Sequence, residues 1–284
     1  MDIEQVAVFY NSINVDIITV KNFYTKLKKI CKCLKPVDIT NRREVSLFLE
    51  AMKKMKNIKN IFLINLGGDG SLFSSLSILA KTLETQKIHT ISFNFGNKGF
   101  YCFYPKNLLF DFLEDKINIM DIIKNDYEEG NFVEGYFWLA NEEPFIGDVV
   151  IKPYNQYKTI RLSYRIEDKE IEEICDGIIV FTTFGATGYF LSLNGVYIDN
   201  GFKDLIGLSF IAPHSLKHRP HLLKNKKISI TNKDKKTAIV INDGQDKFLL
   251  ESNKTIEISR SDKEFILIGQ KNTFKRWVEI FYDK

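Results

Sequence analysis

The chain has 284 residues, of which 44% are hydrophobic and 27% charged, as in ordinary globular proteins, and it is long enough for two modest domains. Its net charge of +4, without a dominant basic run, argues against a dedicated nucleic-acid-binding protein and suits an anionic small substrate. The sequence contains no uninterrupted run of about 18 apolar residues, so we expect no membrane span. No basic leader precedes a long apolar segment, so we also expect no signal peptide.

The first 104 residues alternate between buried strands and amphipathic helices. Compact apolar runs predict strands, and apolar residues at spacings of three and four predict helices. Such alternation is typical of an α/β layer with a parallel sheet. In chain order we expect a strand at 3–10, helices at 15–33 and 41–55, a strand at 60–66, a helix at 71–85 and a strand at 89–95.

After residue 104 short alternating runs dominate, among them DVVIKPY, TIRLSYRI, GIIVFTT, TIEISRS and FILIG. Turn residues such as PYNQ and NDGQD separate these runs, which predicts an all-β domain. We therefore expect an α/β domain over 1–104 and a β-rich domain over 105–265. The tail 266–284 should form a short helix or an edge strand that packs back on the first domain.

The four cysteines are Cys31, Cys33, Cys102 and Cys175. They are too few and too scattered for a disulfide framework, which favours a reducing, cytoplasmic compartment. Cys31 and Cys33 form a C-x-C pair, but no further metal ligands lie nearby in the sequence, so we expect buried or idle thiols.

The loop NLGGDGSLF at 65–73 joins a predicted strand to a predicted helix. Its glycines let a ligand approach the backbone, and the helix that follows presents free N–H groups to an anion. Gly67, Gly68, Gly70 and Ser71 could therefore cradle phosphates, although neither a P-loop nor a complete dinucleotide fingerprint is present.

Asp69 has the wrong charge for a phosphate ligand, so it needs another explanation. A carboxylate at this place can accept a proton from a hydroxyl that attacks a phosphoryl group. The alternative is that Asp69 only caps the helix beginning at Gly70 or Ser71. We favour the catalytic interpretation because the whole Gly-Gly-Asp-Gly-Ser loop lies between a buried strand and an amphipathic helix.

This loop resembles that of the superfamily of NAD kinases, diacylglycerol- and sphingosine-type lipid kinases and 6-phosphofructokinases. A second segment, CDGIIVFTTFGATGYFLSLNG at 175–195, resembles the NAD kinase pattern. Further matches to that family occur at 94–104, 139–145, 212–220 and 242–245, in the family's order. Departures from the pattern include Asn97, Lys98, Thr183, Phe184 and Gly188.

The resemblance to NAD kinases, of the bacterial type, implies a Rossmann-like N-terminal domain followed by a β-sandwich-like domain, with NAD between them. It implies transfer of a phosphoryl group from ATP to the 2′-hydroxyl of the adenosine ribose of NAD, with Asp69 as general base and Mg²⁺ entering with ATP. It also implies a homodimer or homotetramer. The NAD-binding residues that it implies are Asp69, Gly70, Asn141, Glu142, Asp176, Thr187, Gly188, Tyr189, Ser192 and Gln245.

Two alternatives stay open at this point. A lipid kinase would share the role of Asp69 but would need an apolar acceptor pocket, and a non-catalytic NAD(P) sensor would bind the dinucleotide without consuming ATP. His214, His218 and His221 lie within one short segment, but a rigid loop between Pro213 and Pro220 explains them better than a metal site does.

Overall fold

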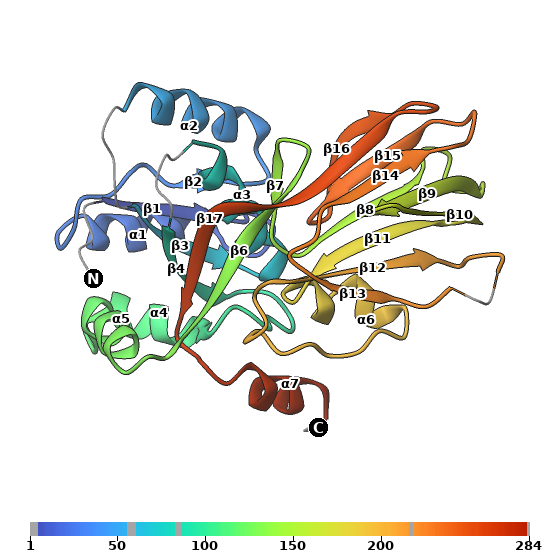
Figure 1. Cartoon of the computed structure of the whole chain (residues 1–284). Coiled ribbons are helices and arrows are strands. Elements are labelled where there is room, and N and C mark those ends of the chain that lie inside the picture. The colour runs from blue at the N-terminus through green and yellow to red at the C-terminus, as the bar shows by residue number, and fades with distance from the viewer. Residues whose placement is uncertain (1–4, 56–60, 83–86, 216–217, 283–284) are drawn as a thin grey trace. The chain divides into compact units, whose positions relative to one another are not determined.

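The structure is a computed structural model that describes residues 5–55, 61–82, 87–215 and 218–282. The chain forms two compact units, the first made of residues 1–134 and 263–284 and the second of 135–262; their elements are labelled in Figure 1. The boundary lies at 134, not near 104 as expected, because two helices over 106–128 extend the first unit. The tail 263–284 also belongs to the first unit.

The sheet of the first unit is parallel and runs in the order β2, β1, β3, β4 and the end of β17. Every residue of β3 is buried, which explains its continuous apolar sequence. A short strand, β5, also pairs with β4. The bounds are β1 (Gln5–Tyr10), β2 (Val37–Asp38), β3 (Ile61–Gly67), β4 (Lys87–Asn94), β5 (Tyr104–Pro105) and β17 (Thr255–Ile268).

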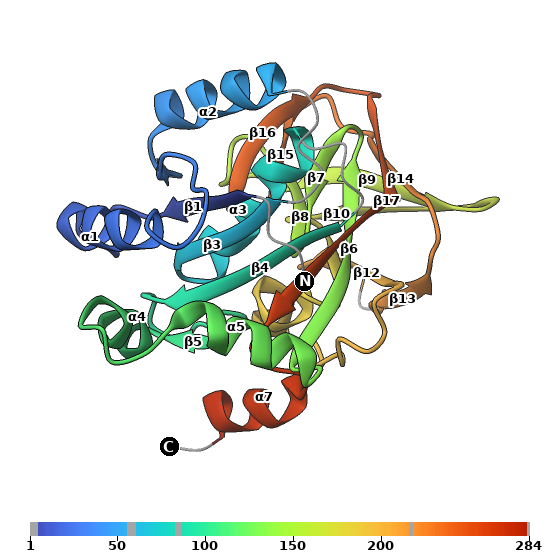
Figure 2. The same cartoon turned by 90° about the vertical axis from the view of Figure 1, so that its left-hand side faces the viewer.

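Helices cover both faces of this sheet, as in other doubly wound folds. Val6 and Val8 of β1 pack in one core cluster with Phe23 of the first helix, whereas Phe9 meets Phe48 of the second helix at 5.0 Å between ring centroids. Figure 2 shows the fourth and fifth helices lying beside β5. The bounds are α1 (Ile17–Leu27), α2 (Arg42–Lys54), α3 (Asp69–Thr82), α4 (Lys106–Leu113), α5 (Ile119–Glu128) and α7 (Thr273–Phe281).

The second unit contains two antiparallel sheets that enclose one apolar core. One sheet pairs β10, β9, β14 and the start of β17; the other has the order β13, β12, β11, β8, β15, β16. The expected α/β layer and β-sandwich-like region are thus confirmed. The bounds are β6 (Phe132–Ala140), β7 (Glu143–Phe145), β8 (Asp148–Pro153), β9 (Ile160–Ile166), β10 (Lys169–Cys175), β11 (Gly177–Thr182), η1 (Gly185–Thr187), α6 (Tyr189–Ser192), β12 (Leu205–Ile211), β13 (His221–Lys224), β14 (Ile228–Asn232), β15 (Ala238–Asn242) and β16 (Gln245–Leu250).

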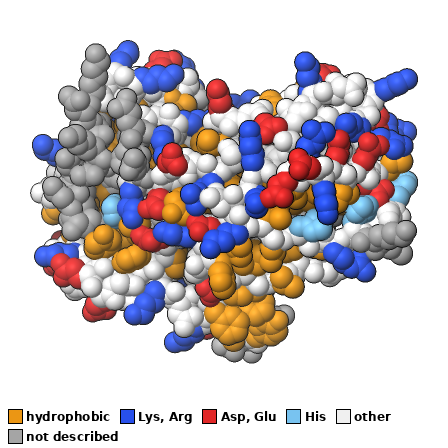
Figure 3. Space-filling model, viewed as in Figure 1, with side chains coloured by type: hydrophobic (Ala, Val, Ile, Leu, Met, Phe, Trp, Pro, Cys, Tyr) orange, Lys and Arg blue, Asp and Glu red, His pale blue; other side chains and the backbone are white. Residues whose placement is uncertain are grey.

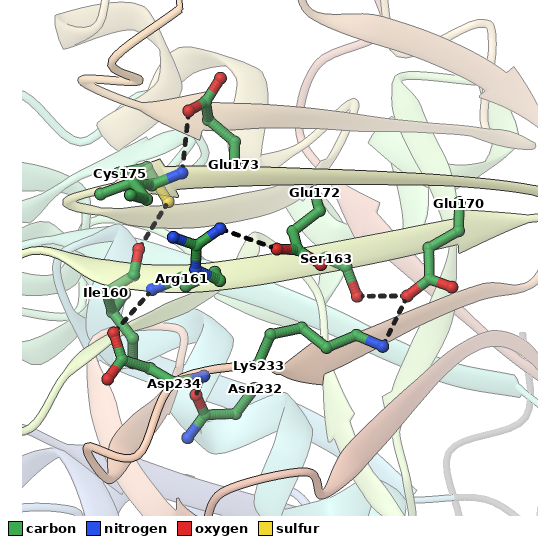
Figure 4. A network of polar contacts seen from close by, with 11 residues as sticks. Ile160, Arg161, Ser163, Glu170, Glu172, Glu173, Cys175, Asn232, Lys233 and Asp234 are labelled. Carbon is green, nitrogen blue, oxygen red and sulfur yellow. Dashed lines mark hydrogen bonds and ion pairs between the residues drawn. The ribbon is translucent and has the colours of Figure 1, made fainter.

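Polar side chains on β9 and β10 form a network of hydrogen bonds and ion pairs (Figure 4). Arg161 donates to Glu172 at 3.0 Å, and Lys233 pairs with Glu170 at 2.9 Å. Hydrogen bonds from Lys233, and from other neighbours, lower the pKa of Glu170 to about 2. Exposed pairs of this kind are screened by water and contribute little to stability. We interpret this network as a solvated sheet surface rather than a site.

The C-terminal part of the chain departs from the sequence prediction in one respect. The runs TIEISRS and FILIG are not two strands, because both belong to the single long strand β17. The tail then forms the helix α7, where hydrophobic side chains gather on the surface (Figure 3). Phe274 and Tyr282 are more than half exposed there. Within the described ranges, no helix is both long and apolar enough to span a membrane.

Candidate active site

The Gly-Gly-Asp-Gly loop lies at the carboxyl end of β3, where open parallel sheets bind their ligands. Gly67 ends β3 opposite Asn94 of β4, and its carbonyl accepts the N–H of Phe95 at 3.0 Å. Gly67 has no room for a side chain, because a Cβ would lie 2.6 Å from Oγ of Ser71. The next loop also comes close, since a Cβ on Gly96 would lie 3.2 Å from Cα of Gly68.

Asp69 is the first residue of α3, and its carboxylate points to the loop 99–102. Oδ2 accepts the backbone N–H of Phe100 at 2.7 Å, while Oδ1 accepts those of Tyr101 at 2.8 Å and Cys102 at 3.2 Å. These bonds join segments about thirty residues apart in the chain. These acceptor contacts of Asp69 go to another loop and not to the first turn of α3, so they argue against the helix-cap alternative.

A cation lies on the other side of the same loop. The Arg276 guanidinium on α7 donates from Nε to the carbonyl of Phe100 and from Nη2 to that of Gly99, both at 2.6 Å. A third bond joins Nη2 to the carbonyl of Cys102 at 3.0 Å. Burial raises the pKa of Asp69, and the backbone N–H groups and the Arg276 charge oppose that rise. The carboxylate of Asp69 is thus desolvated, but the N–H groups and Arg276 partly compensate its negative charge.

Ser71 and Gly70, the other residues expected at the phosphates, differ in their surroundings. Ser71 is buried, and Asn11 at the end of β1 donates Nδ2 to its Oγ at 3.2 Å. Gly70 is exposed, with nothing within 4 Å of the place a Cβ would occupy. Among the residues that the structure describes, none requires glycine at position 70, whereas a closely approaching ligand would.

In the second unit, the segment after β11 makes a tight turn. The Thr182 hydroxyl donates to the carbonyl of Ile146 and accepts the N–H of Phe184 at 3.0 Å. Gly185 packs directly against the backbone of Gly147, where a Cβ would collide. Phe184 is buried, so in this structure its ring fills the core and is not presented to a ligand.

The expected dinucleotide residues that follow lie together on this turn and on α6. Thr187 and Gly188 form the end of η1 and the start of α6, and Tyr189 and Ser192 are the ends of α6. Tyr189 is 42% exposed, so its ring is available to stack on a base. The Ser192 hydroxyl donates to the carbonyl of Tyr189 at 2.7 Å.

Asp176 lies at the opposite end of β11 from this turn. It immediately precedes the strand, and Thr182 ends it, so strand geometry separates the two by about 20 Å. The Asp176 N–H bonds the carbonyl of Ile211, next to the loop that carries His214. Asp176 and the start of the turn that carries Thr187 and Tyr189 thus lie at opposite ends of one strand.

Asn141 and Glu142 form the tight turn between β6 and β7. Asn141 has a positive φ of 56°, and its Oδ1 accepts the N–H of Glu257 at 2.9 Å while its own N–H bonds the Glu257 carbonyl. These contacts give Asn141 a structural role in the turn. Glu142 is exposed to solvent.

Asp148 is a candidate that the sequence prediction missed. It begins β8 beside the turn, and its Oδ2 lies 3.9 Å from where a Cβ of Gly188 would be. Burial and the neighbouring charge of Asp243 raise the pKa of Asp148 to about 7. Asp243 itself accepts the N–H groups of Ile146, Gly147 and Asp148. The signal in the sequence was an acid directly before the apolar run VVI.

Gln245, the last expected residue, begins β16 and accepts a bond from Lys247 at 2.8 Å. Of the three histidines in the segment 214–221, His218 contacts Glu173 through Nε2 at 2.8 Å. Among the residues that the structure describes, no group of three His, Cys, Asp or Glu could hold a metal ion. The four cysteines are free, with the sulfurs of Cys31 and Cys33 3.3 Å apart.

Comparison with known proteins identifies the family. Residues 146–269 match the model of the ATP-NAD kinase C-terminal domain. An NAD kinase of Campylobacter jejuni is 32% identical over 213 residues, which cover 74% of this chain and 72% of that protein. An NAD kinase of Caldicellulosiruptor saccharolyticus is 27% identical over 88% of this chain and 92% of its own length.

Solved structures share the fold. An NAD kinase from Archaeoglobus fulgidus in complex with ATP superposes with a TM-score of 0.69 at 20% identity, covering 95% of this chain and 96% of that one. A yeast NADH kinase complexed with NADH gives a TM-score of 0.71 at 16% identity, covering 99% and 89%. The resemblance noted from the sequence motifs is thus confirmed, and this chain belongs to the NAD kinase family.

Proposed function

We propose that the chain transfers the terminal phosphoryl group of ATP to the 2′-hydroxyl of the adenosine ribose of NAD, giving NADP and ADP. Family membership supports this reaction. The observation that carries it is the desolvated Asp69 carboxylate at the head of α3, beside glycines at the carboxyl end of a parallel strand. A sugar hydroxyl is a poor nucleophile unless a base accepts its proton.

In this proposal Asp69 is the general base. A carboxylate has about four acceptor positions, and three backbone N–H groups occupy part of that capacity. The Cys102 thiol is a further neighbour, but it donates to the carbonyl of Gly67 at 3.5 Å, so a ribose hydroxyl can donate to the remaining acceptor position of Asp69. Gly67, Gly68, Gly70 and Ser71 then bind phosphate oxygens at the positive end of α3.

The acceptor is held by residues of the second unit. Tyr189 offers a ring face, and Thr187, Gly188 and Ser192 offer hydroxyl and backbone groups close to it. We add Asp148 because its half-buried carboxylate lies beside Gly188. Asn141, Glu142, Asp176 and Gln245 stay in the proposal on the family resemblance alone.

The family's divalent cation does not match a protein cage in this chain. Within the described part of the chain no three ligating side chains gather, and both oxygens of Asp69 already accept backbone N–H groups. We therefore propose that Mg²⁺ enters with the phosphates of ATP. We further propose a homo-oligomer, on the family resemblance, and a reducing cytoplasm, because the chain lacks a disulfide framework.

A coupled assay tests the reaction directly. Purified protein is mixed with ATP, Mg²⁺ and NAD, and NADP is followed with an NADP-specific dehydrogenase. NADP formed in step with ADP supports the proposal. ATP consumption only with liposomes would indicate a lipid kinase instead, and a shift in melting temperature with NAD but no ATP consumption would indicate a sensor. Repeating the assay with NADH in place of NAD shows which acceptor the protein uses. Replacing ATP by inorganic polyphosphate shows which phosphoryl donor it uses.

A further inference from the structure

The C-terminal helix α7 contacts the loop 99–102 of the first unit through the side chain of Arg276. Trp277 of the same helix lies against the rings of Phe274 and Phe281, and Lys98 lies 4.9 Å from the centroid of the Phe281 ring. Arg276, by contrast, makes three hydrogen bonds to the loop 99–102. The helix therefore presents a guanidinium to that loop.

The same loop supplies the N–H groups that bind Asp69. The peptide group between Gly99 and Phe100 accepts from Arg276 on its oxygen and donates to Asp69 from its nitrogen. The peptide group between Phe100 and Tyr101 does the same. Two consecutive peptide groups thus connect a cation to the carboxylate, and such chains of hydrogen bonds polarise and strengthen one another.

The backbone of this loop is committed to one conformation. Gly99 has a φ of +55°, and a Cβ there would collide with the side chain of Asn94. The planar fork of Arg276 spans the carbonyls of 99, 100 and 102 at once, which a lysine ammonium cannot do. The direction of the three N–H groups therefore depends on the guanidinium that holds the carbonyls.

We propose that Arg276 is a positioning residue for phosphoryl transfer: by fixing the loop 99–102 it aims the backbone N–H groups that orient the Asp69 carboxylate. This inference rests on the proposed function, since it assigns Asp69 as the base. Arg276 acts through the loop and does not need to touch either substrate. A misplacement of about 1 Å in a reacting group can cost about a hundredfold in rate.

The titration of Asp69 gives a second readout. The groups that face this carboxylate are Arg276 on α7 and the Cys102 thiol of the loop, and the Arg276 charge lowers the pKa of Asp69. Loss of Arg276 should therefore raise that pKa. The base then becomes protonated at a higher pH, so the acidic limb of kcat moves upward. A helix that merely stabilises the fold would not move this limb.

The test uses the full-length protein with Arg276→Ala, Arg276→Gln and Arg276→Lys. Lys275→Ala is the matched control, because Lys275 is an exposed cation of the same helix, paired with Glu279 at 3.9 Å. For Arg276→Ala we expect kcat to fall about 10- to 100-fold, with KM for ATP and NAD little changed and the acidic limb at higher pH. Added guanidinium ion should restore part of kcat.

The conservative variants separate geometry from charge. Arg276→Lys should keep most of the pH profile yet not recover full kcat, whereas Arg276→Gln should lose both. If Arg276→Ala does not fold by circular dichroism, these two variants carry the test. Wild-type kcat and an unshifted pH limb in the folded variants would overturn the inference. Because wild type and Lys275→Ala are assayed alongside, failure of both to form NADP would instead count against the proposed function.

Discussion

Two aspartates in different units of the molecule are held by the same local device. Asp69 accepts the N–H groups of three consecutive residues, 100–102, and Asp243 accepts those of 146–148. Both are followed by glycine, and burial raises the pKa of both carboxyls. Sequence and burial alone would give them the same role.

Their charged neighbours differ. The loop that holds Asp69 is bound on its far side by Arg276, so the negative charge is compensated. Asp243 has a cation nearby, Lys247, whose charge lowers its pKa, and also a second carboxylate, Asp148, whose pKa the charge of Asp243 raises. The backbone bond from Asp243 to the Asp148 carbonyl, 2.9 Å long, ties this pair into a turn. Both carboxylates thus have a cation nearby, and the two places differ in what else lies beside them: Asp69 begins the helix α3, whereas Asp243 lies next to a second carboxylate, Asp148.

Replacement of Asp69 by asparagine should have the largest effect. The amide keeps the size of the side chain but is not a base at neutral pH, and loss of a general base costs about 10²–10⁴ in rate. We expect kcat for NADP formation to fall by this factor while NAD still binds, as measured by the coupled assay and by calorimetry. Normal turnover in a folded Asp69→Asn protein would remove this residue from the mechanism.

Replacement of Asp243 by alanine should mainly cost stability. It leaves three backbone N–H groups without their acceptor, and each buried unsatisfied donor costs about 1–3 kcal/mol, with partial relaxation. We expect the free energy of unfolding in urea to fall by about 3 kcal/mol. Asp243→Asn should lose less stability than Asp243→Ala, because the amide oxygen can still accept some of these N–H groups. An unchanged unfolding curve would mean that the two aspartates do not differ as argued.

The parts of the fold that follow from local pattern were predicted correctly. β3 is a fully buried parallel strand, so its sequence is almost entirely apolar and ends at glycine, and β4 beside it is mostly buried. The helices α4 and α5 were missed because they are short and follow the last clear parallel strand. The sequence does carry a signal for α5: Asn118 caps this helix, and the buried Ile119 and Ile123 lie at helical spacing.

The candidate site was predictable only where it is contiguous in the chain. The loop containing Asp69 carries its glycines, strand end and helix start in one stretch. Arg276 was not identifiable, because its link to Asp69 passes through a loop more than 170 residues away in sequence. Asp148 was not identified, because only the position of β8 beside the Gly185 turn brings it close to Gly188.

Asp148 should make stability depend on pH, which sharpens the contrast with Asp69. Its pKa rises from an ordinary 3.8 to about 7 in the folded chain, so the folded state holds a proton that the unfolded state releases. Stability should therefore be greatest at low pH and fall between those two values, by at most about 1.4 kcal/mol per pH unit from this group. Urea unfolding of wild type and Asp148→Asn across this range measures the difference. The variant should lose this component, and parallel curves would contradict the assignment.

The smallest expected effect is that of Gly70→Ala, which should change the KM for ATP without lowering the stability of the fold. Nothing lies within 4 Å of the place where a Cβ would be, and the residue is inside α3, so Gly70→Ala should fold normally or gain about 0.5–1 kcal/mol. If phosphate oxygens approach this backbone, the methyl group should still raise KM for ATP, by about tenfold or 1.4 kcal/mol. Gly130→Ala provides a control glycine that also has open space but has a φ of +72°, so it should lose stability without a change in KM. An unchanged KM in Gly70→Ala would place the phosphates elsewhere and leave Asp69 without the neighbouring phosphoryl group that its role requires.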